Sequence, residues 1–254
     1  MTGFGAFFAK EMLEIRRTWR AWVVPGLLLF FGVTSPIIAL VTPSLLASVA
    51  GSQPGLVIQL PEPTAADASA QFLKNLSQIV LFALVIAAAG AVSGERSSGT
   101  AMLALAKPLS RPAFVLAKQV ADQLLLVAGA IAGTLACGVM TLILFGNVGW
   151  GALVAATALW LVLALLVTAV VHLCSVLFRS RGAAAGAGLG FLFLLLVAGI
   201  WPPAQMYSFV GLMSAFAAVL GGRPVTWGWP VATAAVAAAV ATYVAIRQFE
   251  RQEL

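Results

Sequence analysis

The residues that could carry out chemistry are few and lie far apart in the sequence. The chain has one histidine, His172, and two cysteines, Cys137 and Cys174. A zinc site needs three or four such ligands, and no second histidine or cluster of cysteines or carboxylates accompanies His172. A serine nucleophile would have to pair Ser93 with His172, but Ala91 stands where a G-x-S motif has its glycine. We therefore expect no metal and no catalytic centre, with His172 a satisfied polar side chain and both cysteines small buried apolar residues.

Nucleotide and nucleic-acid binding are also not expected of this chain. The phosphate-binding motif G-x-x-x-x-G-K-[ST] does not occur in the sequence, so ATP cannot be held in the usual glycine-rich loop. No basic stretch is interleaved with a groove-binding motif. If ATP drives this protein, another polypeptide must bind it.

The composition is that of an integral membrane protein. Of the 254 residues, 62% are hydrophobic and 9% are charged, whereas soluble domains average about 25% charged residues. The mean hydropathy is +1.05. Since a membrane span needs roughly 20 apolar residues, the charge-free runs predict an all-α fold in a single transmembrane domain, 1–254. The six predicted spans lie at about 22–42, 75–94, 122–145, 152–178, 183–201 and 226–246.

The basic residues orient these spans. With six spans, 12 of the 14 lysines and arginines fall on one side, and only Lys74 and Arg223 fall on the other. Cytoplasmic segments are enriched in lysine and arginine, so we expect a multi-pass protein of a bacterial cytoplasmic (inner) membrane with both termini in the cytoplasm. The net charge of +6 then reflects topology and contact with anionic lipid headgroups.

Residues 1–21 are predicted to form an amphipathic helix at the inner membrane surface. Aromatic residues recur here at spacings of three or four and belong at headgroup depth. The residues concerned are Phe4, Phe8, Trp19 and Trp22.

Two outer segments join the spans. Residues 41–74 contain four prolines and several charges, which predicts an outer loop, with a short surface helix around Ser44–Ala50. After Trp201 the chain stays apolar up to Leu220 and is broken by prolines or glycines at both ends. This pattern predicts a re-entrant or surface helix pair before the last span.

Small residues mark a packing face at the start of the fifth span. Gly182, Gly186 and Gly190 lie four residues apart, a spacing that lets two helix backbones approach closely. The sequence leaves two readings open, packing across a dimer interface and packing within one subunit.

The long polar stretch from Gly94 to Lys118 lies between the second and third spans. Its sequence is GERSSGTAMLALAKPLSRPAFVLAK. Pro108 and Pro112 stop helices and push the residues before them out of the helical region. We therefore predict a short amphipathic helix bracketed by helix breakers, in a cytoplasmic loop over 95–117, which can receive force from a partner protein.

This stretch resembles the first cytoplasmic loop of type-two ABC exporter permeases. The resemblance rests on an acidic residue, Gly-Thr, a small apolar helix, Pro-Leu-Ser-Arg and a lysine. It is close over about 25 residues and extends to the layout of the whole chain. An ordinary interfacial connector is the alternative interpretation of the same stretch.

The resemblance implies a permease subunit of an ATP-driven exporter for drugs or lipids. In that family the loop is a coupling helix that docks on a separate ATPase subunit. ATP and magnesium would be bound by two copies of that partner, and a second permease copy or a paralogue would complete the channel. The expected ATPase-docking residues are Glu95, Arg96, Gly99, Thr100, Met102, Leu103 and Leu105. Arg111 and Lys118 are expected to anchor the loop to lipid headgroups.

Two alternatives remain open. An ion-coupled secondary carrier would normally bury ionisable residues at mid-membrane, and none of the predicted spans has a central one. Within the ABC interpretation, some members move small sulfur-containing species to a periplasmic partner for metal-centre assembly. A separate outer-side accessory protein would then be needed. The sequence does not rank these substrate classes.

Overall fold

The computed structural model describes residues 3–18, 20–50, 62–106 and 109–252. The described chain is helical and contains no strand. Its elements, in chain order, are α1 (Phe4–Arg17), α2 (Arg20–Ala50), α3 (Ala65–Asn75), the π-helix η1 (Leu76–Val80), α4 (Leu81–Ala88), α5 (Ser93–Ser97), α6 (Thr100–Leu105), α7 (Arg111–Phe145), α8 (Trp150–Leu177), α9 (Arg181–Ala198), α10 (Pro202–Tyr207), the 3₁₀ helix η2 (Phe209–Gly211), α11 (Leu212–Leu220) and α12 (Gly228–Glu250).

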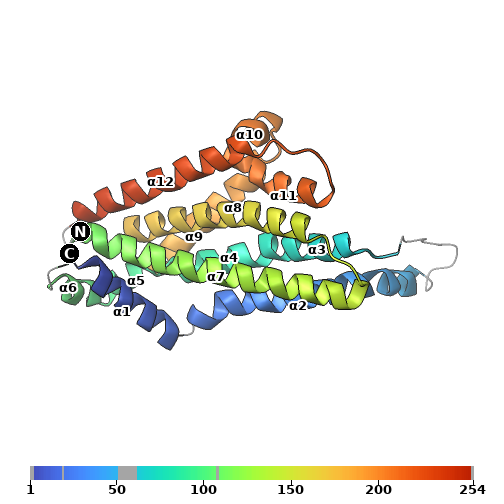
Figure 1. The fold of residues 1–254 in the computed structure, drawn as a ribbon. Helices are drawn as coiled ribbons and strands as arrows, with labels where there is room; N and C mark the ends of the chain where they lie inside the picture. The colour runs from blue at the N-terminus through green and yellow to red at the C-terminus, as the bar shows by residue number, and fades with distance from the viewer. Residues whose placement is uncertain (1–2, 19, 51–61, 107–108, 253–254) are drawn as a thin grey trace.

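Within the described residues, six helices are long and apolar enough to cross a membrane. They are Trp22–Leu46, Ala65–Ser97, Arg111–Phe145, Trp150–Leu177, Arg181–Ala198 and Gly228–Glu250. This confirms the predicted all-α membrane fold with six spanning helices. The long helices run side by side, and the start of α1 and the end of α12 lie at the same end of the bundle (Figure 1). We call this the terminal end.

The first two spanning helices extend further than the sequence predicted. Helix α2 continues through Pro43 to Ala50, so the predicted surface helix at Ser44–Ala50 is part of α2. Helix α3 begins at Ala65, where Thr64 and Asp67 form a reciprocal capping box that satisfies two open N–H groups. The prediction began this span at residue 75 because a charge-free run begins after Lys74. Lys74 is nevertheless part of the helix, where it lies on an exposed face. The outer loop is therefore shorter than predicted.

Helices α2 and α7 make the most extensive helix–helix contact in the bundle. Their backbones meet at glycines: a Cβ on Gly32 would lie 2.5 Å from the Gly133 carbonyl oxygen, and one on Gly133 would lie 2.6 Å from that of Leu28. A Cβ on Gly129 would lie 2.8 Å from a Leu28 methyl group. Residues 129 and 133 are thus a small-xxx-small pair that packs within the subunit.

Helix α8 lies at the centre of the bundle, and its side chains fill the main core. Trp160, Leu153 and Leu163 are fully buried on it and belong to one apolar cluster that includes residues of α2, α4, α7, α9 and α11. The short helices α10 and α11 precede α12, as the predicted helix pair before the last span requires.

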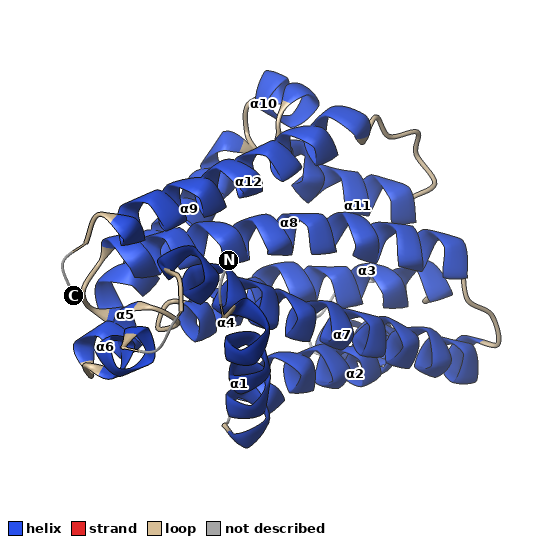
Figure 2. Cartoon of the chain, turned by 60° about the vertical axis from the view of Figure 1, so that its left-hand side comes forward, coloured by secondary structure: helices blue, strands red, loops and turns tan. Residues whose placement is uncertain are grey.

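A second apolar cluster closes the terminal end. The Phe114 ring stacks on Phe249 of α12 with a centroid distance of 5.2 Å, and Phe7 of α1 packs on Phe114 at the same distance. Arg111 donates to the carbonyl oxygens of residues 249, 250 and 252, which are open at a helix C-terminus. Helix α1 crosses this end of the bundle at a steep angle to the long helices (Figure 2). The ends of α1, α7 and α12 are therefore fixed to one another.

Candidate functional site

The predicted short helix of the polar stretch is present at the terminal end. Helix α5 ends at Ser97, and α6 begins at Thr100 after Gly99, whose φ is 74°. This left-handed conformation suits glycine because other residues carry a Cβ penalty there. The Thr100 hydroxyl donates to the Glu95 carbonyl oxygen at 3.3 Å. Helices α5 and α6 therefore form one short angular element, which we call the α5–α6 element.

A buried ion-pair network joins the α5–α6 element to α1 and α7. The Lys118 ammonium group donates to both carboxylate oxygens of Glu11 at 3.0 Å and to Glu95 Oε1 at 2.6 Å. The side chains of Lys118 and Glu11 are each 3% exposed, and that of Glu95 is 16% exposed. Charge-assisted hydrogen bonds of this geometry satisfy the buried charges. Three segments far apart in the sequence are thus held by one ammonium group.

Lys10 extends the network toward the surface. Its Nζ lies 2.9 Å from Glu11 Oε1, 2.5 Å from Glu14 Oε2 and 3.6 Å from Glu95 Oε1. Burial favours the neutral amine, but the hydrogen bonds to Glu14 and Glu11 and the charge of Glu95 outweigh it and raise the pKa of Lys10. Lys10 therefore stays charged at neutral pH, and it loses its charge when the pH rises through this raised pKa.

The predicted roles of Lys118 and Arg111 as headgroup anchors do not fit their positions. Lys118 is buried between two carboxylates, and Arg111 binds the C-terminal carbonyls of α12. Carboxylates and backbone carbonyl oxygens of the protein itself already bind these two cationic groups. The sequence showed the charges, but the partners of Lys118 lie 107 and 23 residues away, and no local pattern reveals such a contact.

The predicted docking residues divide into two groups. Glu95 points into the network, and Arg96 donates through Nη1 to the Val176 carbonyl oxygen at 2.9 Å. Thr100 is exposed, and Met102 is 55% exposed. The side chains of Leu103 and Leu105 lie outside the described residues. Glu95 and Arg96 therefore hold the element at its base, while Met102 and Thr100 are exposed on α6.

The second spanning helix is broken just before the α5–α6 element. Residues 89–92 form turns between α4 and α5. The Ser175 hydroxyl of α8 accepts the N–H groups of Val92 and Ser93, each at 3.0 Å, and donates to the Ala89 carbonyl oxygen at 2.7 Å. This buried side chain replaces helical hydrogen bonds at the break. No motif in the sequence marks Ser175 for this role.

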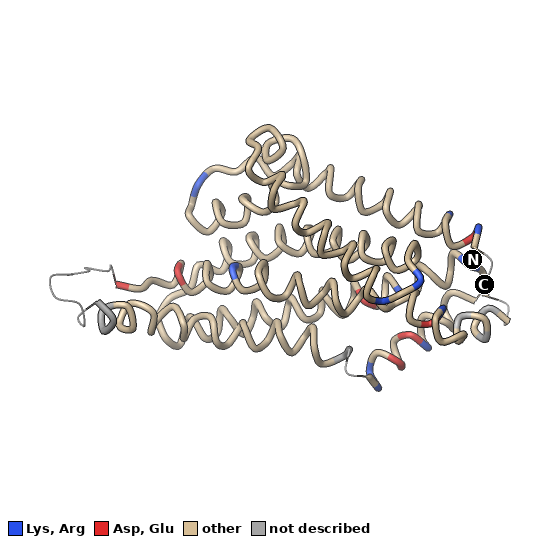
Figure 3. The backbone as a smooth tube through the Cα atoms, turned by 180° about the vertical axis from the view of Figure 1, so that it is seen from behind, with Lys and Arg blue, Asp and Glu red and all other residues tan. Residues whose placement is uncertain are grey.

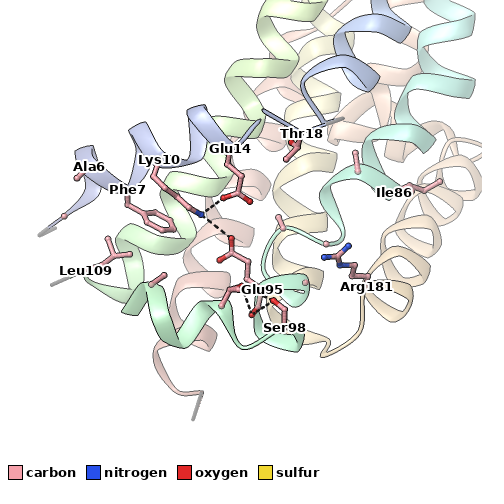
Figure 4. A pocket seen from close by; sticks show the side chains of 17 residues that line it. Ala6, Phe7, Lys10, Glu14, Thr18, Ile86, Glu95, Ser98, Leu109 and Arg181 are labelled. Carbon is pink, nitrogen blue, oxygen red and sulfur yellow. Dashed lines mark hydrogen bonds and ion pairs between the residues drawn. The ribbon is translucent and has the colours of Figure 1, made fainter. Parts of the chain in front are cut away.

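A cleft of about 970 Å³ lies between α1, the broken second span and the first residue of α9. Figure 4 shows Lys10, Glu14 and Glu95 on one wall and Arg181 on the opposite wall. Apolar side chains of Phe7, Ile86 and Leu109 also line it. Three carboxylates here, Glu11, Glu14 and Glu95, are close enough to share a cation, but the ammonium groups of Lys10 and Lys118 already pair with them.

The predicted packing glycines lie on the outer face of α9. A Cβ on Gly182, Gly186 or Gly190 would meet no atom within 4 Å. The glycine of this helix that packs inside the subunit is Gly188, where a Cβ would lie 2.7 Å from Val85 Cγ1. The predicted stripe therefore makes no close helix contact within the described part of the subunit.

The aromatic residues predicted for the interfacial helix are partly exposed. Phe4 and Phe8 stack with a centroid distance of 5.9 Å, and Trp22 is 76% exposed. Trp19 lies outside the described residues. The buried residues of α1 are Glu11 and Ile15, so its inward face combines an ion pair with an apolar contact.

His172 is fully buried in α8. Its Nδ1 lies 2.8 Å from the Thr168 carbonyl oxygen, and its Nε2 lies 3.2 Å from Asp122 Oδ2 of α7. The Nδ1 atom is therefore hydrogen-bonded, whereas Nε2 lies within ion-pair distance of a carboxylate and has no hydrogen-bond partner among the described residues.

The comparisons with known proteins agree with this architecture. A family model described as ABC-2 family transporter protein matches residues 6–217. The chain is also similar to the "Uncharacterized transmembrane protein YxlG" of Bacillus subtilis (strain 168), with 21% identity over 185 residues, 73% of this chain and 72% of the relative. The family match covers most of the chain and includes the α5–α6 element. The chain therefore belongs to the ABC-2 family of transporter proteins and is a membrane permease component of an ABC transporter.

Proposed function

We propose that this chain is the permease of an ATP-driven exporter and that the α5–α6 element is its docking site for the ATPase. The observation that carries the proposal is the construction of this element. Lys118 and the Val176 carbonyl hold its base, and Met102 and Thr100 are exposed beyond it. A firmly held element with an exposed apolar tip transmits force to the helices that hold it.

The proposed mechanism is mechanical. Two copies of a separate ATPase subunit bind ATP and magnesium, and their closure moves the α5–α6 element. The element favours different arrangements of the spanning helices because its contacts differ between the two ATPase states. Substrate access then alternates between the two sides of the membrane.

Charge distribution supports the proposed orientation. Lysines and arginines gather at the terminal end of the bundle, and few lie at the opposite end (Figure 3). By the positive-inside tendency, the terminal end and both termini face the cytoplasm of a bacterial cell, where ATP is available. The cargo remains either an amphiphilic molecule or a small sulfur-containing species passed to an outer-side partner.

A glutamate at the tip is expected to abolish ATPase docking. In Met102→Glu, a charge replaces an apolar contact that must be desolvated on docking. We expect at least a tenfold loss of the ATPase that co-purifies with the tagged permease from native membranes in mild detergent. Mass spectrometry identifies the captured protein by its Walker motif.

Met206→Glu is the matched control for this experiment. Met206 is 56% exposed, against 55% for Met102, but lies in α10, far along the chain from the α5–α6 element. Capture should stay within about twofold of the wild-type level in this variant. Equal capture by both variants would contradict docking at α6, and recovery of the permease without any Walker protein would contradict the ATPase partnership.

The outer face of α9 supports a proposed dimer of permeases. Gly182, Gly186 and Gly190 leave open space beside the helix, as a close helix–helix contact requires. Cysteine at position 186 is expected to form a crosslinked dimer in membranes, after replacement of the native cysteines. Cysteine at position 188, which faces the subunit interior, should give none. A scan of positions 182–190 that yields no dimer would disprove this interface.

A further inference from the structure

The two walls of the cleft differ in how their charges are paired. On one wall, Lys10 contacts three carboxylates. On the other wall, Arg181 is exposed. None of the carboxylates that the structure describes forms an ion pair with its guanidinium group. Among the described residues that line the cleft, Arg181 is therefore a cation without an ion-pair partner (Figure 4).

The backbone beneath Arg181 makes room for this cation. A Cβ on Gly94 would lie 2.6 Å from both Nε and Nη2 of Arg181, and one on Gly90 would lie 3.1 Å from its Cδ. Because both positions are glycine, the arginine side chain lies directly against the broken second span and its guanidinium group lines the cleft. This placement is local to Arg181, since Arg179 does not line the cleft.

The cleft also extends from an apolar zone to the polar end of the spans. Ile86, in the apolar part of the second spanning helix, is 62% exposed. Ser98 and Thr100 line the other part of the cleft, beyond the end of that helix. Arg181 is the first residue of the fifth spanning helix. In a membrane, a side chain at this position lies at the depth of the lipid headgroups.

We propose that this cleft binds an anionic amphiphile, with a phosphate group on Arg181 and an acyl chain along Ile86. Guanidinium groups bind phosphate through two parallel charge-assisted hydrogen bonds. The volume of about 970 Å³ is at the upper end of the roughly 300–1,000 Å³ of small-molecule sites, which accommodates a headgroup and the first part of its chains. The amphiphile is a resident membrane phospholipid or a cargo molecule of the same chemistry.

Lipid binding to the purified permease tests the site without any ATPase, so its outcome is independent of the proposed coupling. Native mass spectrometry measures the binding of dioleoyl phosphatidylglycerol, with dioleoylglycerol as the probe that lacks phosphate. Arg181→Gln is expected to weaken phosphatidylglycerol binding at least tenfold. Arg179→Gln removes an equal charge two residues away and should change it less than twofold. Equal losses in the two variants, or equal binding of dioleoylglycerol, would overturn the proposal.

A second variant tests the apolar part of the cleft. Ile86→Trp narrows the proposed chain path and leaves Arg181 in place, so phosphatidylglycerol binding should fall at least threefold. Unchanged binding in this variant would contradict the acyl-chain position. If Arg181→Gln instead lost ATPase capture and retained full lipid binding, the arginine would serve a protein contact and the lipid site would be disproved.

The source of the amphiphile follows from the same measurement in the presence of the ATPase. Bound phosphatidylglycerol that persists during ATP turnover identifies a resident lipid. Bound lipid that is released on turnover identifies a cargo. The lipid followed in this measurement is the fraction whose binding is lost in Arg181→Gln, so either result supports the site.

Discussion

Lys118→Met is expected to destabilise the terminal end of the protein more than any other single change to a charged residue described above. The ammonium group pairs with Glu11 and Glu95 in a buried site, so its removal leaves two carboxylates without their main partner. Breaking a buried ion pair by removing one partner costs roughly 3–5 kcal/mol. We expect a clear fall in the thermal unfolding midpoint in detergent, together with loss of ATPase capture, because the base of the α5–α6 element is released.

Two further variants show whether the ion pair is the cause. Lys74→Met removes an exposed lysine near the opposite end of the bundle and should leave the midpoint nearly unchanged. Adding Glu11→Gln to Lys118→Met removes a buried carboxylate that is left with Lys10 as its ion-pair partner, so the double variant should be more stable than the sum of the single effects predicts. Purely additive effects, or a Lys118 variant as stable as the Lys74 variant, would show that the network contributes little.

Gly133→Ala is expected to destabilise the bundle through a single methyl group. Its Cβ would lie 2.6 Å from the Leu28 carbonyl oxygen, and the contact is with backbone, which cannot rotate away. Helices α2 and α7 would have to separate along their main contact. Overpacking of this kind costs about 1–3 kcal/mol, and we expect a value in the upper part of that range.

Gly26→Ala provides a control of opposite sign on the partner helix. A Cβ at Gly26 meets no atom within 4 Å, and alanine is about 1 kcal/mol more favourable than glycine inside a helix. The thermal midpoint should therefore rise slightly in Gly26→Ala and fall in Gly133→Ala. A shift in the same direction for both variants would show that the α2–α7 contact is looser than the structure indicates.

The fold could be predicted because its main signals are local. A charge-free run that is long enough to cross a membrane forms a spanning helix whatever it packs against, so six were found. Gly99 before the short helix and Pro108 and Pro112 after it indicated where this helix lies. The boundaries at Ala50 and Ala65 were predicted less well, because a helix can continue past Pro43 or past an exposed Lys74 without any change in the charge-free run.

The candidate site was less predictable because its contacts are between distant segments. Glu11 and Glu95 were visible as charges, but only the fold brings both to Lys118. The glycine at 133 has the same spacing signal as the predicted stripe at 182–190, and nothing in the spacing says which stripe faces inward. Arg181 appeared as one of many basic residues. No carboxylate among the described residues forms an ion pair with Arg181, and a sequence alone does not show this.

The break at residues 89–92 divides the second span into two helical segments, α3–α4 before it and α5 after it. Because the Ser175 hydroxyl accepts the N–H groups of Val92 and Ser93, the second segment is attached to α8 at the break itself. Arg96 adds a second attachment, to the Val176 carbonyl oxygen. Under the proposed coupling, a movement of α6 is transmitted first to the C-terminal end of α8, and the part of the second span before the break moves less. The central helix α8, rather than the span that carries the docking element, then transmits the movement to the rest of the bundle.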